Sequence, residues 1–157
     1  METSSNQPAH IRPARTEDAA DWLVMWQDLV ATGPEPCAPD AAAAAWRRVM
    51  DPADAMKCLI AADGAGRAVG FCLYLTHDYS WTTRPICYLL DLYVRPAMRR
   101  RGLGRALIEA LAAIGRDAGW LKIYWMTQAD NTAAHTLYGK IARRSPLVRY
   151  DLNLAPH

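Results

Sequence analysis

Residues 87–105 read CYLLDLYVRPAMRRRGLGR, and this stretch decides the fold. Cys87 to Val94 is almost continuously apolar, which is typical of a central strand covered on both faces. Pro96 ends that strand, because proline cannot donate to a sheet ladder. From Leu103 to Ile114, apolar residues recur at three- and four-residue intervals. This period predicts a helix, so the stretch is expected to form a strand, a polar turn and a helix.

The turn carries five arginines close to the start of the predicted helix, at positions 95, 99, 100, 101 and 105. A helix N-terminus is already positive because its first N–H groups are unpaired, so added cations are unfavourable there unless an anion binds. Gly102 and Gly104 lack a Cβ and would let the backbone approach that anion. A Walker loop would need Gly-Lys-Ser/Thr, and a dinucleotide fingerprint would need glycine where Leu107 stands. A basic turn that only caps a core helix stays an alternative for these residues taken alone.

The rest of the chain predicts a mixed α/β domain. Period-2 or apolar runs indicate strands, and helical periods with capping residues indicate helices. The turn cluster at 63–66 joins two of the strands into a hairpin. Strands are expected over residues 10–14, 58–61, 68–75, 87–94, 121–127 and 147–154, and helices over 19–31, 41–50, 103–114 and 131–142.

Composition excludes several classes of protein. A 52% hydrophobic fraction with 22% charged residues in 157 residues excludes a disordered chain, and no apolar run approaches the roughly 18 residues of a membrane helix. The net charge of +2 argues against nucleic acid or a membrane as a partner. The four cysteines form no C-x-x-C pair, and the N-terminus resembles no secretion signal, so a cytoplasmic protein with reduced thiols is expected. Residues 1–9 are interpreted as a loose tail and 10–157 as a single domain.

Two motifs together resemble the GNAT superfamily of acetyl-CoA-dependent N-acetyltransferases. The first is Arg99-x-x-Gly102-x-Gly104, which is similar to that family's pyrophosphate loop. The second is Asn131-x-x-Ala134-x-x-Leu137-Tyr138, on a helix that follows a strand. More narrowly, Tyr88 to Val94, Tyr124 to Asn131 and the ending Val148-Arg149-Tyr150 resemble a small branch that contains yeast histone and D-amino-acid acetyltransferases and bacterial relatives.

The resemblance implies an α/β GNAT fold. Its central mixed, mostly antiparallel sheet would have six to seven strands, about four flanking helices and central strands that splay apart. It also implies transfer of an acetyl group from acetyl-CoA to a primary amine by direct attack. The acceptor would be a small-molecule amine or amino acid, with a protein lysine as a second possibility. Related proteins and the alternating last strand make a homodimer plausible.

The resemblance also implies where the coenzyme binds. Its pantetheine arm would pair with backbone groups of Leu92 and Val94 and contact Asn131, with its sulfur near Tyr138. The pyrophosphate would rest on the backbone amides of the turn. The residues implied for the pyrophosphate are Arg99, Arg100, Arg101, Gly102, Leu103, Gly104 and Arg105.

Direct attack requires proton transfers, and the sequence offers candidates for them. Tyr138 is the candidate proton donor to the departing thiolate, because a phenol holds its proton at neutral pH. Asp91 is the candidate base. Relatives commonly carry Glu-Asp where this chain has Leu90 and Asp91, and strict alternation puts Asp91 on the opposite face from Tyr88 unless a bulge intervenes. A structural role for Asp91 therefore stays open, as does His77 as the titrating group.

The acceptor is expected to meet the loop after the hairpin, where His77, Tyr79 and Trp81 are the candidate substrate-binding residues. Trp22 and Trp26 have the spacing of a buried helix face instead.

The four histidines are isolated from one another and from the cysteines, so no metal site is expected. Because position 90 holds leucine where relatives commonly carry an acid, a non-catalytic acyl-CoA-binding or sensing module is the alternative function. Binding of nucleic acid through the arginines is a third hypothesis, which the near-neutral charge disfavours.

Overall fold

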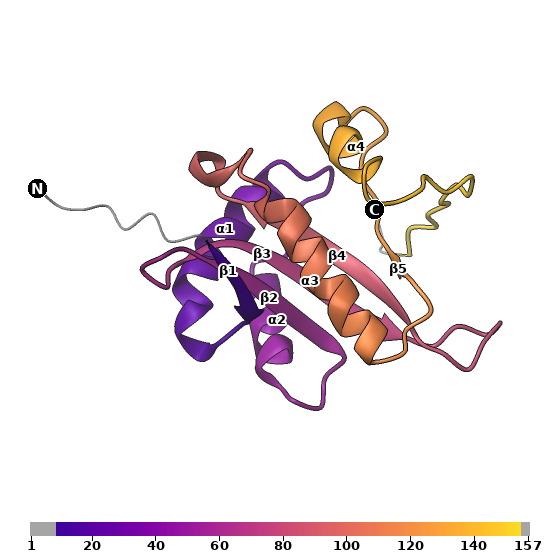
Figure 1. Ribbon diagram of the computed structural model, residues 1–157, viewed down its shortest axis with the longest axis horizontal. Coiled ribbons are helices and arrows are strands. Elements are labelled where there is room, and N and C mark those ends of the chain that lie inside the picture. The colour runs from indigo at the N-terminus through magenta and orange to yellow at the C-terminus, as the bar shows by residue number, and fades with distance from the viewer. Residues whose placement is uncertain (1–8, 155–157) are drawn as a thin grey trace, which may run out of the picture. The chain divides into compact units, whose positions relative to one another are not determined.

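The computed structural model describes residues 9–154, and within this range five strands form one sheet in the order β1-β2-β3-β4-β5. Its order along the chain is strand, two helices, a three-stranded meander, a helix, a short strand and a helix (Figure 1). Two 3-10 turns, Thr16–Asp18 and Pro96–Met98, precede α1 and α3. The strands are β1 (His10–Pro13), β2 (Met56–Ala62), β3 (Ala68–His77), β4 (Ile86–Val94) and β5 (Ile123–Tyr124), and the helices are α1 (Ala19–Ala31), α2 (Ala41–Met50), α3 (Leu103–Asp117) and α4 (Thr132–Tyr138).

The mixed sheet confirms the predicted fold class. β1 to β4 pair antiparallel in sequence order, and β5 alone runs parallel to its neighbour β4. β2 and β3 form the expected hairpin, in which Asp63 accepts hydrogen bonds from the backbone N–H groups of Ala65 and Arg67 at 2.9 and 3.0 Å. Gly66 completes this turn with a φ of +82°, a conformation that glycine adopts without strain.

The expected six to seven strands were wrong, because the described residues form five. The strand predicted over 121–127 shortens to Ile123–Tyr124, and residues 147–154 form no strand. Alternation selects which side chains share a face, but a strand exists only where a neighbouring edge accepts its hydrogen bonds. The alternating side chains of the last segment are exposed. The helix expected over 131–142 is likewise shorter and ends at Tyr138.

Helices cover both faces of the sheet: α3 lies across one face, and α1 and α2 lie against the other (Figure 1). The core on the α1 and α2 face is aromatic. Trp22 packs at ring-centroid distances of 5.0 Å from Trp46 and 5.9 Å from Phe71, and it is 1% exposed. The prediction of a buried helix face for Trp22 is therefore confirmed. On the other face, Leu107 and Leu111 of α3 are fully buried.

A buried ion pair fixes the entry into α1. Arg12 donates to both oxygens of Asp18, at 2.7 and 2.8 Å, and the Arg15 N–H donates to the same carboxylate at 2.8 Å. The side chains are 10% and 4% exposed. Burial alone would raise the pKa of Asp18, but these three hydrogen bonds outweigh it and hold the pKa below its usual value. Asp18 therefore anchors β1 to the turn before α1.

Three of the four cysteines are buried in the sheet, and all four are free thiols, as expected. Cys58, Cys72 and Cys87 lie in β2, β3 and β4, where burial raises the pKa of each thiol, that of Cys87 to about 12. Cys37, in the linker between α1 and α2, is exposed. These buried thiols act as small apolar side chains.

The chain divides into two compact units, residues 1–126 and 127–157. The first holds the whole sheet with α1 to α3, and the second holds α4 and the C-terminal segment. Of the tail expected over residues 1–9, all but Ala9 lies outside the described residues, and the single domain over 10–157 stays a prediction. Among residues 9–154, no helix has the length and apolar character needed to cross a membrane.

Candidate active site

β4 contains a β-bulge at its centre. Leu73 of β3 pairs with Asp91, whereas the next residue of β3, Tyr74, pairs with Leu89. Leu90 therefore stands as one extra residue in β4, and the register shifts by one at this point. A bulge changes which face the following side chains occupy, so simple alternation does not hold across it.

The bulge moves Asp91 to the face on which α1 and α2 pack. Directly opposite residues of an antiparallel pair share a face, and Leu73, the partner of Asp91, belongs to the core against those helices. Tyr88 pairs with Leu75 and so lies on that face as well. Asp91 is half-buried, and burial raises the pKa of its carboxyl group. A carboxylate with a raised pKa is a stronger base than one in water.

The ladder between β4 and β5 is short and leaves most of one edge of β4 without a β5 partner. Cys87 pairs with Ile123 and Tyr88 with Tyr124, and β5 ends there. The splayed central strands expected from the sequence therefore begin just after Tyr88.

Backbone directions along β4 identify the groups at that edge. The Arg95 N–H donates to the carbonyl of Val69 in β3 at 2.9 Å. Residues 95 and 93 therefore direct their backbone N–H and C=O groups toward β3. Because directions alternate along a strand, Leu92 and Val94 direct theirs toward the other edge. These are the two residues whose backbone was expected to pair with the pantetheine arm.

The arginine-rich turn joins β4 to the N-terminus of α3 with two residues in the left-handed region. Arg100 has a φ of +62° and Gly102 a φ of +78°. Gly102 is the residue before α3 and provides no side chain to cap the helix. The first helical bond runs from the Ala106 N–H to the Gly102 carbonyl at 2.9 Å, so the N–H groups of Leu103 to Arg105 precede the helical ladder. Backbone donors at this place suit an anionic ligand.

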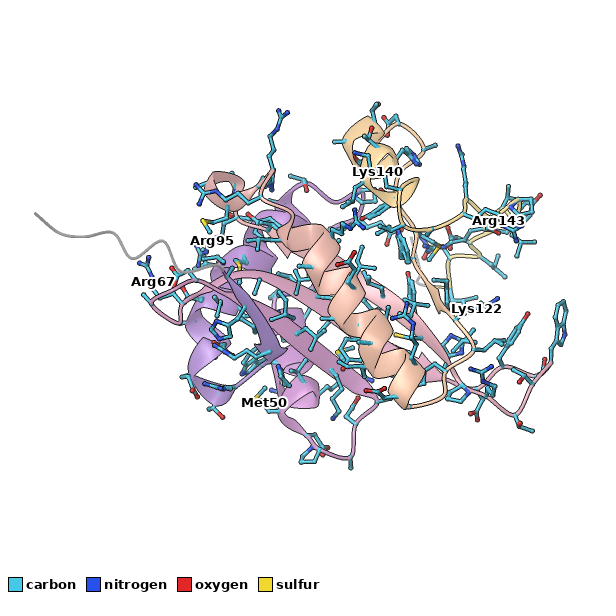
Figure 2. The ribbon with its side chains drawn as sticks, viewed as in Figure 1. Met50, Arg67, Arg95, Lys122, Lys140 and Arg143 are labelled. Atoms are coloured by element: carbon cyan, nitrogen blue, oxygen red, sulfur yellow. The ribbon has the colours of Figure 1, made fainter. Side chains whose placement is uncertain are left out.

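The five arginines around this turn have different partners. Arg95 reaches α1, where it contacts Asp21 at 2.9 Å, and it also donates to the Ala68 carbonyl at 3.2 Å (Figure 2). Arg99 donates to the Val94 carbonyl at 2.9 Å, and Arg105 forms an exposed ion pair with Glu109 at 2.7 Å. Arg100 and Arg101 are exposed. The turn therefore presents the exposed guanidinium groups of Arg100 and Arg101, beside those of Arg99 and Arg105, at the α3 N-terminus.

The second unit contains the other motif. Asn131 caps α4: its side-chain oxygen accepts a hydrogen bond from the Ala134 N–H at 3.2 Å, and its amide donates to Thr127 Oγ1 at 3.3 Å. Tyr138 is the last residue of α4 and is half-buried. Within this unit, Asn131 and Tyr138 therefore occupy opposite ends of one short helix.

The loop between β3 and β4 holds the three candidate substrate-binding residues. His77 ends β3, and Tyr79 and Trp81 follow it with ring centroids 5.5 Å apart. Trp81 is 85% exposed. Lys122, which lies just before β5, places its ammonium 4.8 Å from the centre of the Tyr79 ring (Figure 2). The loop thus presents the exposed Trp81 beside the half-buried Tyr79, with the Lys122 ammonium against the Tyr79 ring.

Sequence reasoning missed Tyr124, which His77 contacts directly. His77 Nε2 lies 2.8 Å from the Tyr124 hydroxyl, and the Tyr124 ring stacks on that of Tyr88. The two tyrosines were read only as part of the family resemblance. Nothing in the sequence around Tyr124 links it to a histidine 47 residues earlier.

A model of the acetyltransferase (GNAT) family matches residues 22–142 of the chain. The chain belongs to the GNAT family. The match spans the bulged strand, the arginine-rich turn and α4, so the GNAT resemblance found in the sequence is confirmed. Together with its relatives, this match places the protein among the N-acetyltransferases.

The D-amino-acid N-acetyltransferase HPA3 of Saccharomyces cerevisiae is 31% identical over 144 residues, which cover 91% of this chain and 89% of that protein. An aminoglycoside N(6')-acetyltransferase type 1 of Stenotrophomonas maltophilia is 33% identical, covering 82% and 81%. A possible acetyltransferase from Clostridium difficile 630 superposes with a TM-score of 0.82 at 16% identity, covering 96% of this chain and 100% of that one. AAC(6')-Iy in complex with a CoA bisubstrate analog superposes with a TM-score of 0.80 at 23% identity, covering 95% and 100%.

GNAT enzymes use acetyl-CoA as the acetyl donor, and the residues of the first unit suit such a ligand. Leu92 and Val94 offer strand-like backbone groups at the β4 edge, which an extended amide-bearing arm can pair with as an added strand. The edge leads to the α3 N-terminus, whose backbone N–H groups and exposed Arg100 and Arg101 suit a diphosphate. The residues present therefore fit the coenzyme.

Proposed function

We propose that this GNAT protein transfers the acetyl group of acetyl-CoA to a primary amine of a small molecule, amino acids included. The observation that supports it most is the continuity of two features: the β4 edge without a β5 partner, and the α3 N-terminus to which that edge leads. Acetyl-CoA, when bound, supplies the activated acetyl thioester. The chain itself binds and orients the coenzyme and the acceptor amine, and its side chains transfer the protons.

Binding is assigned to backbone groups for the most part. The groups of Leu92 and Val94 would hold the pantetheine arm, with Asn131 contributing from α4. The Val94 N–H is also the candidate donor that stabilises a developing oxyanion. The diphosphate would lie on the turn, against the residues predicted for it, Arg99 to Arg105.

Proton transfer is assigned to two side chains. Asp91 would accept the proton of the acceptor ammonium, which must lose it before its nitrogen can attack. The bulge supports this role because it brings Asp91 to the α1 and α2 face, and the raised pKa of its carboxyl supports it as well. Tyr138 would donate a proton to the departing sulfur. Leu90 is apolar, so Asp91 would act without a second acid beside it.

The acceptor class is proposed from the relatives and the loop. The matched relatives are named for D-amino acids and aminoglycosides, both of which are small amines. His77, Tyr79 and Trp81 form an aromatic wall suited to a cationic amine. A protein lysine is the less favoured acceptor. We also propose a homodimer as the working form, since the exposed apolar residues of 147–154 need a partner.

The cofactor is tested by thermal shifts with acetyl-CoA, ATP and NAD. Stabilisation should grow with the logarithm of ligand concentration over Kd for acetyl-CoA alone. Equal shifts for all three would instead show unspecific anion binding at the arginine-rich turn. Acetyl-CoA binding without thiol release for any amine would favour the alternative, a non-catalytic acyl-CoA-binding module, which the apolar Leu90 motivates.

Catalysis is tested by thiol release from acetyl-CoA across a panel of amines, with Tyr138→Phe beside the wild type. Loss of a general acid should lower kcat about 100-fold. Tyr74→Phe is the matched control, because Tyr74 packs against Trp120 at the end of α3 and has no assigned role in binding or catalysis. An unchanged kcat in Tyr138→Phe would contradict the proton-donor assignment.

A further inference from the structure

Three side chains from three strands meet where β4 and β5 separate. Tyr88 and Tyr124 form the last pair of the β4–β5 ladder, and their rings stack with centroids 4.9 Å apart and planes 9° from parallel. His77, the last residue of β3, pairs with Ile86 and therefore shares the face of Tyr88, two residues further along β4. Asp91 occupies the same face beyond the bulge. The cluster and the candidate base are therefore on one side of the sheet.

The hydrogen bonds of His77 fix the direction of the Tyr124 hydroxyl. Nδ1 of His77 lies 2.8 Å from the Asp78 carbonyl oxygen, which can only accept, so Nδ1 carries a proton. In the neutral ring, Nε2 is then the acceptor, and it lies 2.8 Å from the Tyr124 oxygen. Tyr124 therefore donates its hydroxyl proton to His77. Its oxygen keeps lone pairs that can accept a second hydrogen bond.

This direction matters for an amine that must act as a nucleophile. A freely rotating phenol could donate its proton to the nitrogen lone pair, and that pair would then be unavailable for attack. A phenol whose proton is committed to His77 can only accept from an amine N–H. The lone pair of the nitrogen is then left free. The near-parallel stack on Tyr88 holds the ring in place, so the oxygen position is fixed as well as its proton.

We propose that Tyr124 binds the acceptor amine through its hydroxyl oxygen and that His77 is the positioning residue that commits the Tyr124 proton. The proposal rests on the proposed function, because it takes the amine to bind where β4 and β5 separate. It changes the role of His77 from a direct substrate contact to a residue that acts through Tyr124. It also adds a binding residue that neither the motifs nor the family match assigns.

The test is steady-state thiol release with acetyl-CoA saturating and one accepted amine varied. Tyr124→Phe keeps the ring stack and removes only the oxygen, so we expect the KM for the amine to rise about tenfold with kcat within about threefold of wild type. His77→Leu should raise this KM to a similar extent. His77→Gln places an amide oxygen where Nε2 accepts and should restore most of the affinity. His10→Gln, at the exposed start of β1, is the matched control and should be unchanged.

The double variant His77→Leu/Tyr124→Phe decides whether the two residues act together. If His77 acts through Tyr124, the double variant should have the KM of Tyr124→Phe alone. Independent, multiplied effects would overturn the positioning role, and a wild-type KM in Tyr124→Phe would overturn the proposal entirely. Thermal unfolding of each variant verifies that it is folded. A wild-type protein that releases no thiol with any amine would refute the proposed function itself, whereas unaltered variants of an active enzyme would refute only this inference.

Discussion

Asp18 and Asp91 are both acidic side chains withdrawn from water, but their surroundings shift their pKa values in opposite directions. Asp18 accepts three hydrogen bonds, two of them from Arg12, and these outweigh burial and lower its pKa. Asp91 has burial as the cause of its shift, and its pKa rises. A lowered carboxyl pKa means that the charged form stabilises the fold, and a raised one means that the charged form costs stability. Asp18 is therefore a structural residue, whereas Asp91 suits a role in proton transfer.

Asp18→Asn should lower the free energy of unfolding by about 3 kcal/mol at neutral pH, because it leaves the buried Arg12 guanidinium without its counter-charge. Since the folded-state pKa is depressed, the wild type loses this contribution as pH falls through that pKa, and the gap between the two proteins should close in acid. Urea unfolding at several pH values measures it. Asp54→Asn, in the more exposed pair with Arg48, should shift the midpoint much less. Equal losses in both variants would contradict the anchoring role.

Asp91→Asn should lower kcat about 100-fold without loss of stability, since it removes the proposed base and a charge that burial disfavours. Because the folded-state pKa is raised, ionisation of Asp91 costs stability as pH rises toward that pKa, and the variant should be at least as stable as wild type at neutral pH. Thiol release and thermal unfolding measure the two effects. Asp117→Asn, at the exposed end of α3, is the control. A fully active Asp91→Asn would show that another group takes the proton.

The elements differ in how far sequence could predict them. α2 begins and ends at the predicted residues, because Pro39-Asp40 and Asp51-Pro52 bound its helical period locally. The bulge at Leu90 could be offered only as an option, since its position depends on how β3 pairs with β4. Likewise, nothing local connects His77 to Tyr124. Local signals thus gave most helices and strands, and the contacts that shape the site depend on pairing between distant segments.

The end of α3 supports a prediction at the same scale. A Cβ on Gly115 would lie 2.7 Å from Cε3 of Trp120, whose ring packs 6.0 Å from that of Tyr74. Helix propensity alone would make Gly115→Ala stabilising by about 1 kcal/mol. The close approach to Trp120 should reverse the sign and cost about 1–3 kcal/mol. Chemical denaturation measures this loss.

Trp120→Leu supplies the control, because it removes the aromatic ring that the added methyl group would meet. In that background, Gly115→Ala should cost much less than in the wild type. A stabilised Gly115→Ala protein would mean that Trp120 moves aside freely.

At the scale of the whole molecule, residues 147–154 have the alternating sequence pattern of a strand. They pair with no other strand among the described residues, and their apolar side chains are exposed. Alternating apolar residues that remain 74–91% exposed are unusual unless another surface covers them. The residues are Leu147, Val148, Tyr150, Leu152 and Leu154. This exposure supports the proposed homodimer.

Sedimentation of the full chain should give twice the 17.5 kDa chain mass. Adding charge to the segment with Leu152→Lys and Leu154→Lys together should shift the protein toward monomer, because a buried lysine needs a partner. Val24→Lys, on the exposed side of α1, should leave the dimer intact. A wild-type protein that sediments as a monomer at micromolar concentration would refute the assembly.

The placement of the cysteines has a practical consequence for following this protein in solution. Only thiolates react readily with maleimides, and the buried Cys58, Cys72 and Cys87 hold their protons firmly. The exposed Cys37 should thus take up a single fluorescent dye per native chain. Such a label would sit on the Pro-rich linker between α1 and α2, so its emission would report on the surroundings of that linker.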